Sequence, residues 1–402
     1  MTPPLPLAGL RVVEVAQNLA GPYCARILAE LGADVVKVEP PTGDAARSWG
    51  PPFLAGEGTI FAFANTGKRS VRLDLGTGEG MAALRSLVAR ADVLVESLRP
   101  GVLAELGMGW DEARSLNGGL IYASVLAYGQ EGPLKDLPGY EPLMQAHGGL
   151  MSYTGQPGGS PVRVGTSVVD MGTGMWAALG VLAALRERDR TGEGTRISGA
   201  LFDTALTWSG YHLLGALADG TVARRFGTQL PMIAPYGTFP TSDGEVMVAV
   251  GTDPLFARLC GALNLGPLHQ DSRFLHNPER VANREELNLK VCQATRRHTA
   301  QALLDLLRGA GVPCAPVLDV GEILEDAQFR ASGMLSGREA GAGGEPEDTD
   351  APLNTRLPLR WDGERFPVQG PPPGPGAHTR EVLEELGLEP RLIRAILGET
   401  EG

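Results

Sequence analysis

The sequence has few cysteines and no long apolar run. Its 402 residues include 4 cysteines, none of them in a CxxC or zinc-ligand spacing, so we expect neither a disulfide framework nor a structural metal. No stretch reaches the roughly 18 consecutive apolar residues that a membrane helix needs. The opening MTPPLPLAGL lacks the charged start and apolar core of a signal peptide. We therefore expect a cytoplasmic protein without a membrane partner.

Positive charge is also scarce. The formal net charge is -12, so a nucleic acid partner is not expected, and any phosphate-bearing ligand must meet a local group of donors. Apolar residues make up 43% and charged residues 20% of the chain, which is ordinary for a globular protein. A chain of this length predicts two or three domains.

Two common catalytic motifs are missing as well. The sequence contains no GxSxG, and its 6 histidines show no HExxH or other metal-ligand spacing, which disfavours a serine hydrolase and a zinc enzyme. His147, in QAHGG, could act as a base, whereas a lone histidine beside a glycine pair is more often a packing or capping residue.

Strand-like and helix-like segments alternate along the first part of the chain. Buried strands are predicted at residues 10–16, 34–39, 71–75, 92–97 and 121–127, with helical patterns or turn-rich segments between them. Such alternation predicts an α/β fold with a Rossmann-like, mostly parallel sheet that is covered by helices on both faces.

The pattern changes near residue 239. The segment GTFPTSDGEVMVAVG predicts an antiparallel hairpin with Asp243-Gly244 at its turn, and amphipathic helices are expected around 254–264 and 284–309. We therefore expect a smaller α+β domain in this part of the chain.

These patterns predict that the chain divides into three parts. We expect a large α/β domain over residues 1–205, the small domain over 206–330 and a C-terminal segment over 331–402. Within that segment, residues 337–350 are rich in glycine and acidic residues and predict an exposed loop. The run PPPGPG at 371–376 predicts a stiff tether before a final helical stretch.

Glycines follow the strand-like segment VGTSVVD in the pattern Gly172-x-Gly174-x-x-Ala177. This spacing occurs in dinucleotide-binding folds, but the following segment RERDRTGEGTRISGALFD supplies no clear acidic residue at the end of a strand, which disfavours nicotinamide binding. The glycines could instead let two elements pack closely.

Asp170 lies at the same expected junction of strand and helix. The simpler interpretation is a helix N-cap that accepts backbone hydrogen bonds. The functional interpretation uses the same geometry, because a helix N-terminus favours an ionised carboxylate and its free N–H groups can stabilise a developing oxyanion. A carboxylate can act as a nucleophile, although the residue type alone does not establish that role.

Read as whole phrases, the chain resembles the family III CoA-transferases over almost its entire length. The phrases that carry the resemblance are LAELGADVVKVEPPTGD at 28–44, NTGKRSVRLDL at 65–75, ADVLVESLRPGVLAELGMG at 91–109, GYEPLMQAHGGLMSYTG at 139–155 and VVDMGTGMWAALGVLAALRERDRTGEG at 168–194. In the last phrase the family's catalytic aspartate falls on Asp170. The resemblance implies a transferase with acyl-CoA and a small carboxylic acid as substrates, and with no cofactor.

By the same resemblance, Asp170 attacks the donor thioester and forms an acyl-aspartyl anhydride and then an aspartyl-CoA thioester. Glu141 matches a family glutamate close to this nucleophile. CoA is expected along the carboxyl ends of the strands of the large domain. Its expected contacts are Asn18, Leu19, Ala20, Lys68, Arg69, Ser97, Leu98 and Tyr140. The resemblance also implies an intertwined homodimer and a C-terminal segment that returns to the large domain.

Alternatives remain open. The racemase branch of the family uses a histidine-aspartate pair, where this chain has Tyr140-Glu141, so a two-base racemase would need His147 as its second base. A noncatalytic CoA-binding protein and a nicotinamide oxidoreductase are further alternatives. Residues 228–237, TQLPMIAPYG, lack the glycine run of formyl-CoA transferase, which makes oxalate and formyl-CoA poor substrate candidates.

Overall fold

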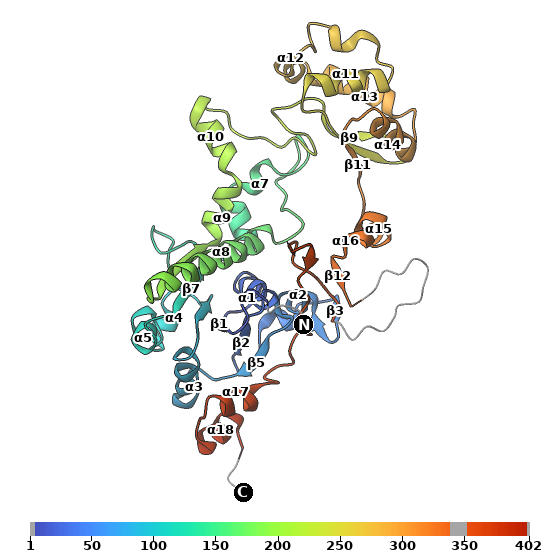
Figure 1. Ribbon diagram of the computed structural model, residues 1–402. Coiled ribbons are helices and arrows are strands. Elements are labelled where there is room, and N and C mark those ends of the chain that lie inside the picture. Colours follow the sequence, from blue (N-terminus) through green and yellow to red (C-terminus); the bar gives the residue numbers. More distant parts are fainter. Residues whose placement is uncertain (1–4, 338–351, 400–402) are drawn as a thin grey trace. The chain divides into compact units, whose positions relative to one another are not determined.

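The computed structural model describes residues 5–337 and 352–399, and the chain forms two units (Figure 1). Unit 1 comprises Met1–Gly149, Gly165–Tyr211 and Arg330–Gly402, and unit 2 comprises Leu150–Val164 and His212–Phe329. The segment Leu150–Val164 therefore belongs with unit 2, although the sequence pattern placed it in the large domain. The expected loop at 337–350 lies, apart from Gly337, outside the described residues.

A 6-stranded parallel sheet forms the centre of unit 1. Its strands run in the order β5-β2-β1-β6-β7-β8, with the bounds β1 (Arg11–Val15), β2 (Asp34–Glu39), β5 (Arg69–Arg72), β6 (Val93–Glu96), β7 (Ile121–Leu126) and β8 (Thr195–Ala200). The predicted α/β class with a large parallel sheet is confirmed. The chain order reverses between β1 and β6, so the carboxyl ends of these strands flank the crevice where open α/β sheets bind ligands.

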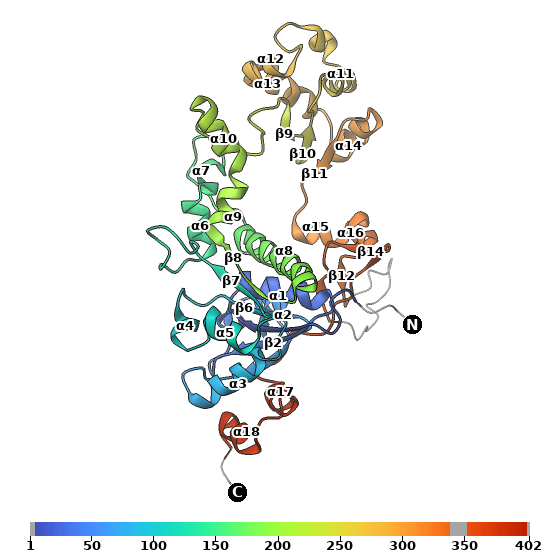
Figure 2. The same cartoon turned by 60° about the vertical axis from the view of Figure 1, so that its left-hand side comes forward.

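Helices cover both faces of this sheet (Figure 2). On one face, Val13 and Val15 of β1 and Val36 of β2 pack in a common core with α3 (Gly78–Val88), α5 (Trp110–Leu116), α17 (Thr379–Glu385) and α18 (Pro390–Leu397). On the other face lie α1 (Ala20–Glu30) and α8 (Val168–Thr191), which pack against each other and against the strands. Alternation of side chains along each strand explains why both faces are buried.

The contact between α1 and α8 depends on a glycine. A Cβ atom on Gly174 would lie 2.6 Å from the carbonyl oxygen of Ala20, so only glycine lets the two helices approach this closely. Gly172 similarly faces Thr204 and Trp208. The glycines of this pattern therefore let α8 pack closely against its neighbours. The expectation of a strand before it is wrong, because residues 161–167 form no strand.

Among the described residues, α8 is the one helix long and apolar enough to span a membrane by length and composition. Half of its most apolar window, 50%, is buried inside the protein. Such burial is typical of the core helix of a folded domain, because the same side chains that raise its hydropathy fill the space against α1 and the sheet.

Shorter elements complete unit 1 and the connections to unit 2. They are η1 (Ala45–Ser48), β3 (Phe53–Leu54), β4 (Glu57–Gly58), α2 (Thr59–Asn65), α4 (Val102–Glu105), α6 (Glu141–His147), α9 (Leu201–Trp208), α10 (Gly210–Asp219), α16 (Ala327–Ser332), β12 (Leu335–Ser336), β13 (Asn354–Thr355), β14 (Arg360–Trp361) and β15 (Glu364–Arg365).

The C-terminal segment packs against the sheet domain. Asn354 Nδ2 donates to the carbonyl oxygen of Ala62 in α2, and the guanidinium of Arg26 bonds the carbonyl oxygen of Thr355. Beyond the proline-rich tether, Gly376 N donates to Ser70 Oγ in β5 at 2.8 Å. Helices α17 and α18 then lie beside β5 and α3. Residues far apart in sequence therefore complete one core.

Unit 2 contains a 3-stranded antiparallel sheet in the order β11-β10-β9. The predicted hairpin is present as β9 (Tyr236–Pro240) and β10 (Glu245–Ala249), and β11 is Cys314–Pro316. Its other elements are α7 (Leu150–Tyr153), α11 (Asp253–Ala262), η2 (Gly266–Gln270), α12 (Asn277–Ala282), α13 (Arg284–Thr295), α14 (Ala300–Gly309) and α15 (Val320–Glu325). The helix expected at 284–309 is two helices, because Thr299 caps the start of α14 with its side chain.

Candidate active site

The turn after β1 lies at the carboxyl edge of the sheet, beside the turn after β6. Gln17 N donates to Ser97 Oγ at 3.4 Å, and Asn18 N donates to Asp44 Oδ1 at 3.2 Å. Asn18 has a φ of 68°, in the left-handed region that asparagine tolerates better than most side chains. The predicted residues of this turn and Ser97 therefore meet at the crevice between β1 and β6.

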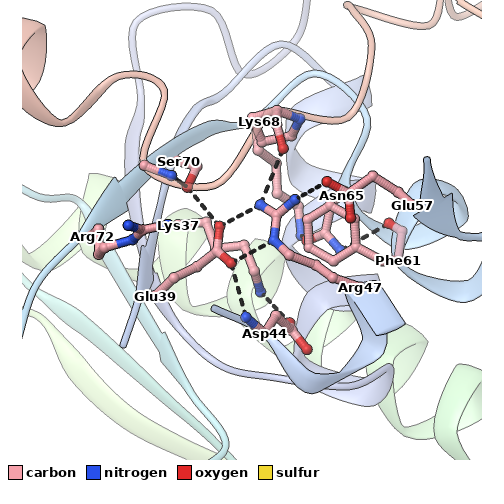
Figure 3. Close-up of polar contacts among 12 residues, drawn as sticks. Lys37, Glu39, Asp44, Arg47, Glu57, Phe61, Asn65, Lys68, Ser70 and Arg72 are labelled. Atoms are coloured by element: carbon pink, nitrogen blue, oxygen red, sulfur yellow. Dashed lines mark hydrogen bonds and ion pairs between the residues drawn. The ribbon is translucent and has the colours of Figure 1, made fainter. Parts of the chain in front are cut away.

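A buried ion pair supports this turn from below. Lys37 Nζ contacts Glu14 Oε1 at 2.8 Å and Asp44 Oδ2 at 2.9 Å, and none of the three side chains is exposed to solvent. The same ammonium donates to the carbonyl oxygen of Ala16 at 2.8 Å. Because Asp44 also accepts from Asn18 N, the ion pair fixes the backbone that leads into the crevice. Figure 3 shows the contact between Lys37 and Asp44.

A second ion pair, between Glu39 and Arg47, holds the segment around Asp44. Glu39 Oε2 accepts from Asp44 N at 2.9 Å and from Arg47 Nε at 2.8 Å. Arg47 also contacts Glu57 Oε1 at 2.6 Å, and its guanidinium lies 3.8 Å from the centre of the Phe61 ring. The pKa of Glu39 is lowered despite its burial, because Arg47 and Ser70 bond its carboxylate. Figure 3 shows these groups converging on one cluster.

The two predicted catalytic carboxylates act on each other. Burial, with the neighbouring Glu141 carboxylate as a second cause, raises the pKa of Asp170 to about 7. Glu141 is the first residue of α6 and is only 3% exposed, and its Oε1 accepts a hydrogen bond from Gln145 Nε2. A carboxylate with such a pKa can be ionised or protonated near neutral pH, as an active-site group requires.

Asp170 is not an N-cap. Helix α8 begins at Val168 after Ser167, so Asp170 is its third residue, within the first turn. The capping interpretation is therefore wrong, and the carboxylate is left to other partners. The first turn still has N–H groups without helical partners, and these favour negative charge.

The same end of α8 meets the turn after β1. Gly174, one helical turn beyond Asp170, packs against the carbonyl oxygen of Ala20. Met171 packs against the buried cluster of Leu19, Tyr23 and Ala64. The structure thus brings the predicted nucleophile and the predicted CoA contacts of residues 18–20 to one place.

The side chains of Lys68 and Arg69 are not available to a ligand at the turn of residues 18–20. The side chain of Lys68 is completely buried, and its Nζ donates to Glu14 Oε2 at 2.6 Å, to Pro22 O at 2.8 Å and to Asn65 Oδ1 at 2.9 Å. Burial lowers the pKa of Lys68 to about 8. With all three donors used, this ammonium has none left for a phosphate.

Arg69 occupies the opposite edge of the sheet. It is the first residue of β5, at the amino edge, and its guanidinium contacts Asp34 Oδ2 at 2.6 Å and Glu385 Oε2 at 2.9 Å. Its expected contact with CoA at the carboxyl edge conflicts with this position. The sequence signal was misleading because a basic pair beside a strand does not reveal which edge it faces.

Tyr140 and His147 lie at the two ends of α6. Tyr140 is 59% exposed and precedes the first residue of the helix, so its ring remains available to a ligand. His147 is also exposed, and its ring packs against Tyr128 and Phe202. Six residues of α-helix place His147 about 120° around the axis from Glu141, so the two side chains leave the helix in different directions.

Two cavities lie along the carboxyl edge, and most of their residues escaped the sequence prediction. One of about 240 Å³ is lined mainly by apolar side chains at or just beyond four strand ends, among them Val15, Val38, Leu73, Leu75 and Leu98, and by Leu106 after α4. The other, of about 500 Å³, extends from Glu96 and Arg99 at the carboxyl end of β6 to Tyr122 of β7 and Arg196 of β8, nearer the amino ends of those strands, and it also contains Lys135. Residues that follow different strands become neighbours only in the parallel sheet, so spacing along the chain does not reveal them.

Comparison with known proteins identifies the relationship. A sequence model described as CoA-transferase family III matches residues 7–379. The chain belongs to this family. The expectations that the chain is a member and that it is a CoA-transferase by class are confirmed.

Individual relatives agree over almost the whole chain. A succinate–glutarate CoA-transferase of Agrobacterium fabrum is 38% identical over 95% of this chain and 96% of its own length. An acetyl-CoA:oxalate CoA-transferase of Acetobacter aceti is 38% identical over 82% and 85%, respectively. The crystal structure of a CAIB/BAIF family protein from Brucella suis superposes with a TM-score of 0.83 at 36% identity, covering 96% of this chain and 100% of that one.

The acidic residues of the crevice have a structural role. Within residues 5–337 and 352–399, no group of three or more His, Cys, Asp or Glu side chains is arranged to hold a metal ion. The acidic residues of the crevice instead bond lysine, arginine or backbone N–H groups. In this CoA-transferase fold they serve to hold the turn at residues 17–20.

Proposed function

We propose that the protein transfers CoA from an acyl-CoA donor to a carboxylic acid through covalent intermediates on Asp170. The observation that carries this proposal is the position of Asp170: a partly buried carboxylate, with a pKa raised to about 7, whose helix packs against the turn at the ligand-binding crevice. A carboxylate becomes a better nucleophile when it is less solvated and is oriented toward its target.

The chemistry follows from this position. Ionised Asp170 attacks the thioester carbonyl, the C–S bond breaks, and an acyl-aspartyl anhydride and CoA thiolate form. The thiolate then attacks the aspartyl carbonyl, giving an aspartyl-CoA thioester and the free donor acid. The acceptor carboxylate repeats both steps in reverse. Each step exchanges one activated carbonyl for another, so the reaction requires neither a metal nor a redox cofactor.

CoA would lie along the carboxyl edge of the sheet. The apolar cavity at Val15, Val38 and Leu98 suits the flat adenine ring or the pantetheine chain. Arg99 and Lys135, both in the neighbouring cavity, are better placed for the phosphates than Lys68 and Arg69. Residues 18–20 would then hold the thioester beside Asp170.

The acceptor is proposed to be a dicarboxylic acid. The relatives from Agrobacterium fabrum and Mus musculus are named for glutarate, and one from Haloarcula hispanica is named for mesaconate. Succinyl-CoA occurs as the donor in two of these names. We therefore propose succinyl-CoA with a dicarboxylate of about glutarate size as the substrate pair.

A homodimer is part of the proposal. Three large apolar side chains on successive turns of α8 are exposed in the single chain: Met175 at 47%, Trp176 at 45% and Leu179 at 53%. An apolar stripe of this kind on a long helix favours a second copy as its cover.

Racemisation is the weaker candidate. It needs two bases on opposite sides of an α-carbon, and the one histidine near Glu141 in sequence, His147, packs against Tyr128 and Phe202 at the surface.

The direct test of CoA transfer incubates the protein with succinyl-CoA and glutarate and follows glutaryl-CoA by chromatography. We expect glutaryl-CoA to form at a rate proportional to enzyme, with ping-pong kinetics. Racemisation of a 2-methylacyl-CoA without transfer to any acid would contradict the proposal.

A further inference from the structure

Unit 2 contains a cavity of about 560 Å³ with its own cluster of cations. Its walls come from three separate stretches of the chain, at residues 152–158, 223–229 and 284–288. Arg224, Arg225 and Arg284 all line it, together with Asn288 and the exposed carboxylate of Glu285. Three guanidinium groups against one carboxylate make the cavity positive in a chain whose net charge is -12.

These arginines have no carboxylate partners within the part of the chain that the structure describes. Arg225 Nη1 donates to the carbonyl oxygen of Ser152 at 2.7 Å. Arg284 donates to Gln229 Oε1 at 3.2 Å and to the carbonyl oxygen of Pro231. Burial lowers the pKa of Arg284. Neutral partners orient these cations without neutralising them, which leaves their charge for a ligand.

The same hydrogen bonds fix the shape of the cavity. Gln229 Oε1 accepts from Asn288 Nδ2 at 3.0 Å as well as from Arg284, which joins the second stretch to α13. Gly227 N donates to Gly155 O at 2.9 Å, which joins the first stretch to the second. The walls are therefore held together before any ligand arrives, which reduces the entropy cost of binding.

Two buried polar atoms in this cavity lack hydrogen-bond partners. They are Arg225 Nε, a donor, and Asn288 Oδ1, an acceptor. Buried polar groups in folded proteins are nearly always paired. The unpaired Arg225 donor can bond an oxygen of an anion, whereas Asn288 Oδ1 is an acceptor and needs a donor such as water. Arg284 is also the first residue of α13, a 12-residue helix, whose positive end adds to the attraction for an anion.

From these observations we infer that the cavity of unit 2 binds an oxyanion, namely a carboxylate or a phosphate group. Guanidinium groups bind both through paired N–H donors. The proposed function supplies two sources of such a group, the dicarboxylic acid and CoA, but the inference about the cavity rests on its own side chains. Arg224 and Arg225 would contact the anion directly, and Arg284 would hold the wall beside it.

The test measures binding of each probe to the full-length protein by isothermal titration calorimetry. Glutarate, inorganic phosphate and CoA are titrated separately at constant ionic strength into wild type, Arg224→Gln and Arg225→Gln. The exposed Arg224 makes no hydrogen bond or ion pair in the described chain, so its replacement should leave the fold intact. Arg297→Gln is the matched control, because it removes the same charge from an exposed residue of unit 2 outside the cavity.

We expect each cavity variant to weaken binding by roughly tenfold, as loss of a charge-assisted contact does, while Arg297→Gln binds as wild type does. If the variants bind only glutarate more weakly, the cavity takes the carboxylic acid. If they bind only phosphate and CoA more weakly, the cavity takes a phosphate group of CoA. Equal affinities in wild type and both cavity variants, or an equal loss in Arg297→Gln, would overturn the inference. Titrating Asp170→Asn separates the two proposals, because that variant should lose transfer and keep this binding.

Discussion

Replacing Glu141 by glutamine should shift the pH dependence of the reaction toward acid. In the proposed mechanism the nucleophile of the free enzyme is the ionised form of Asp170, whose pKa is raised to about 7 by burial and by the negative charge of Glu141. Below that pH, kcat/KM for the acyl-CoA should fall about tenfold per pH unit, because the ionised fraction falls by that factor.

Glutamine keeps the shape of Glu141 and removes its charge. The burial of Asp170 remains and is the larger cause, so its pKa should stay above the ordinary value for aspartate. Removal of a close like charge lowers a carboxyl pKa by roughly 1–2 units, which would place the midpoint near pH 5–6. The activity plateau should therefore extend to lower pH in Glu141→Gln, whatever happens to its height.

The assay measures kcat/KM for succinyl-CoA between about pH 5 and pH 9 and fits the midpoint rather than the plateau. Glu79→Gln, an exposed change on α3, is the control and should keep the wild-type midpoint. A midpoint in Glu141→Gln that is unchanged or moves toward alkaline pH would refute the electrostatic coupling of the two carboxylates.

Three further changes test the framework of the site. Because folding raises the pKa of Asp170 from its ordinary value near 4 to about 7, the wild-type protein loses stability as pH rises across that interval. In urea unfolding, Asp170→Asn should therefore be more stable than wild type at pH 8, by up to roughly 4 kcal/mol, and no more stable at pH 4. Gly174→Ala places a methyl group against Ala20 and should cost roughly 1–3 kcal/mol of stability together with turnover, whereas an unchanged melting temperature would contradict the packing. Asp44→Ala removes one carboxylate partner of the buried Lys37 ammonium and should cost roughly 3–5 kcal/mol of stability. Turnover should also fall, because Asn18 N loses its acceptor in the turn. Full activity in the folded variant would show that Asp44 does not position this turn.

Much of the parallel sheet could be predicted because its strands are short, buried and rich in Val, Ile and Leu. The runs at 34–39 and 121–127 coincide with β2 and with β7 to within one residue. β8 was missed because TRISGA alternates half-buried and exposed residues, with only Ala200 buried, and contains a glycine. Local pattern therefore identifies buried strands well and a half-exposed edge strand poorly.

The roles of the site residues stay predictions, but their positions can be compared with the structure. Asp170 lies close enough to Glu141 for that carboxylate to raise its pKa, as the resemblance implied. Lys68 and Arg69 were misplaced because the sequence cannot show that one ammonium is enclosed by Glu14, Pro22 and Asn65 and that the other cation faces the amino edge. Tertiary contacts, which decide both cases, join residues up to hundreds of positions apart.

Trapping with hydroxylamine tests whether Asp170 forms the proposed covalent intermediates. The protein is mixed with succinyl-CoA, quenched with hydroxylamine and digested, and the peptide that contains Asp170 is examined by mass spectrometry. We expect a hydroxamate on Asp170 that appears only with acyl-CoA and is absent from Asp170→Asn. A wild-type peptide that stays unmodified while CoA transfer proceeds, or a hydroxamate on another carboxylate, would contradict it.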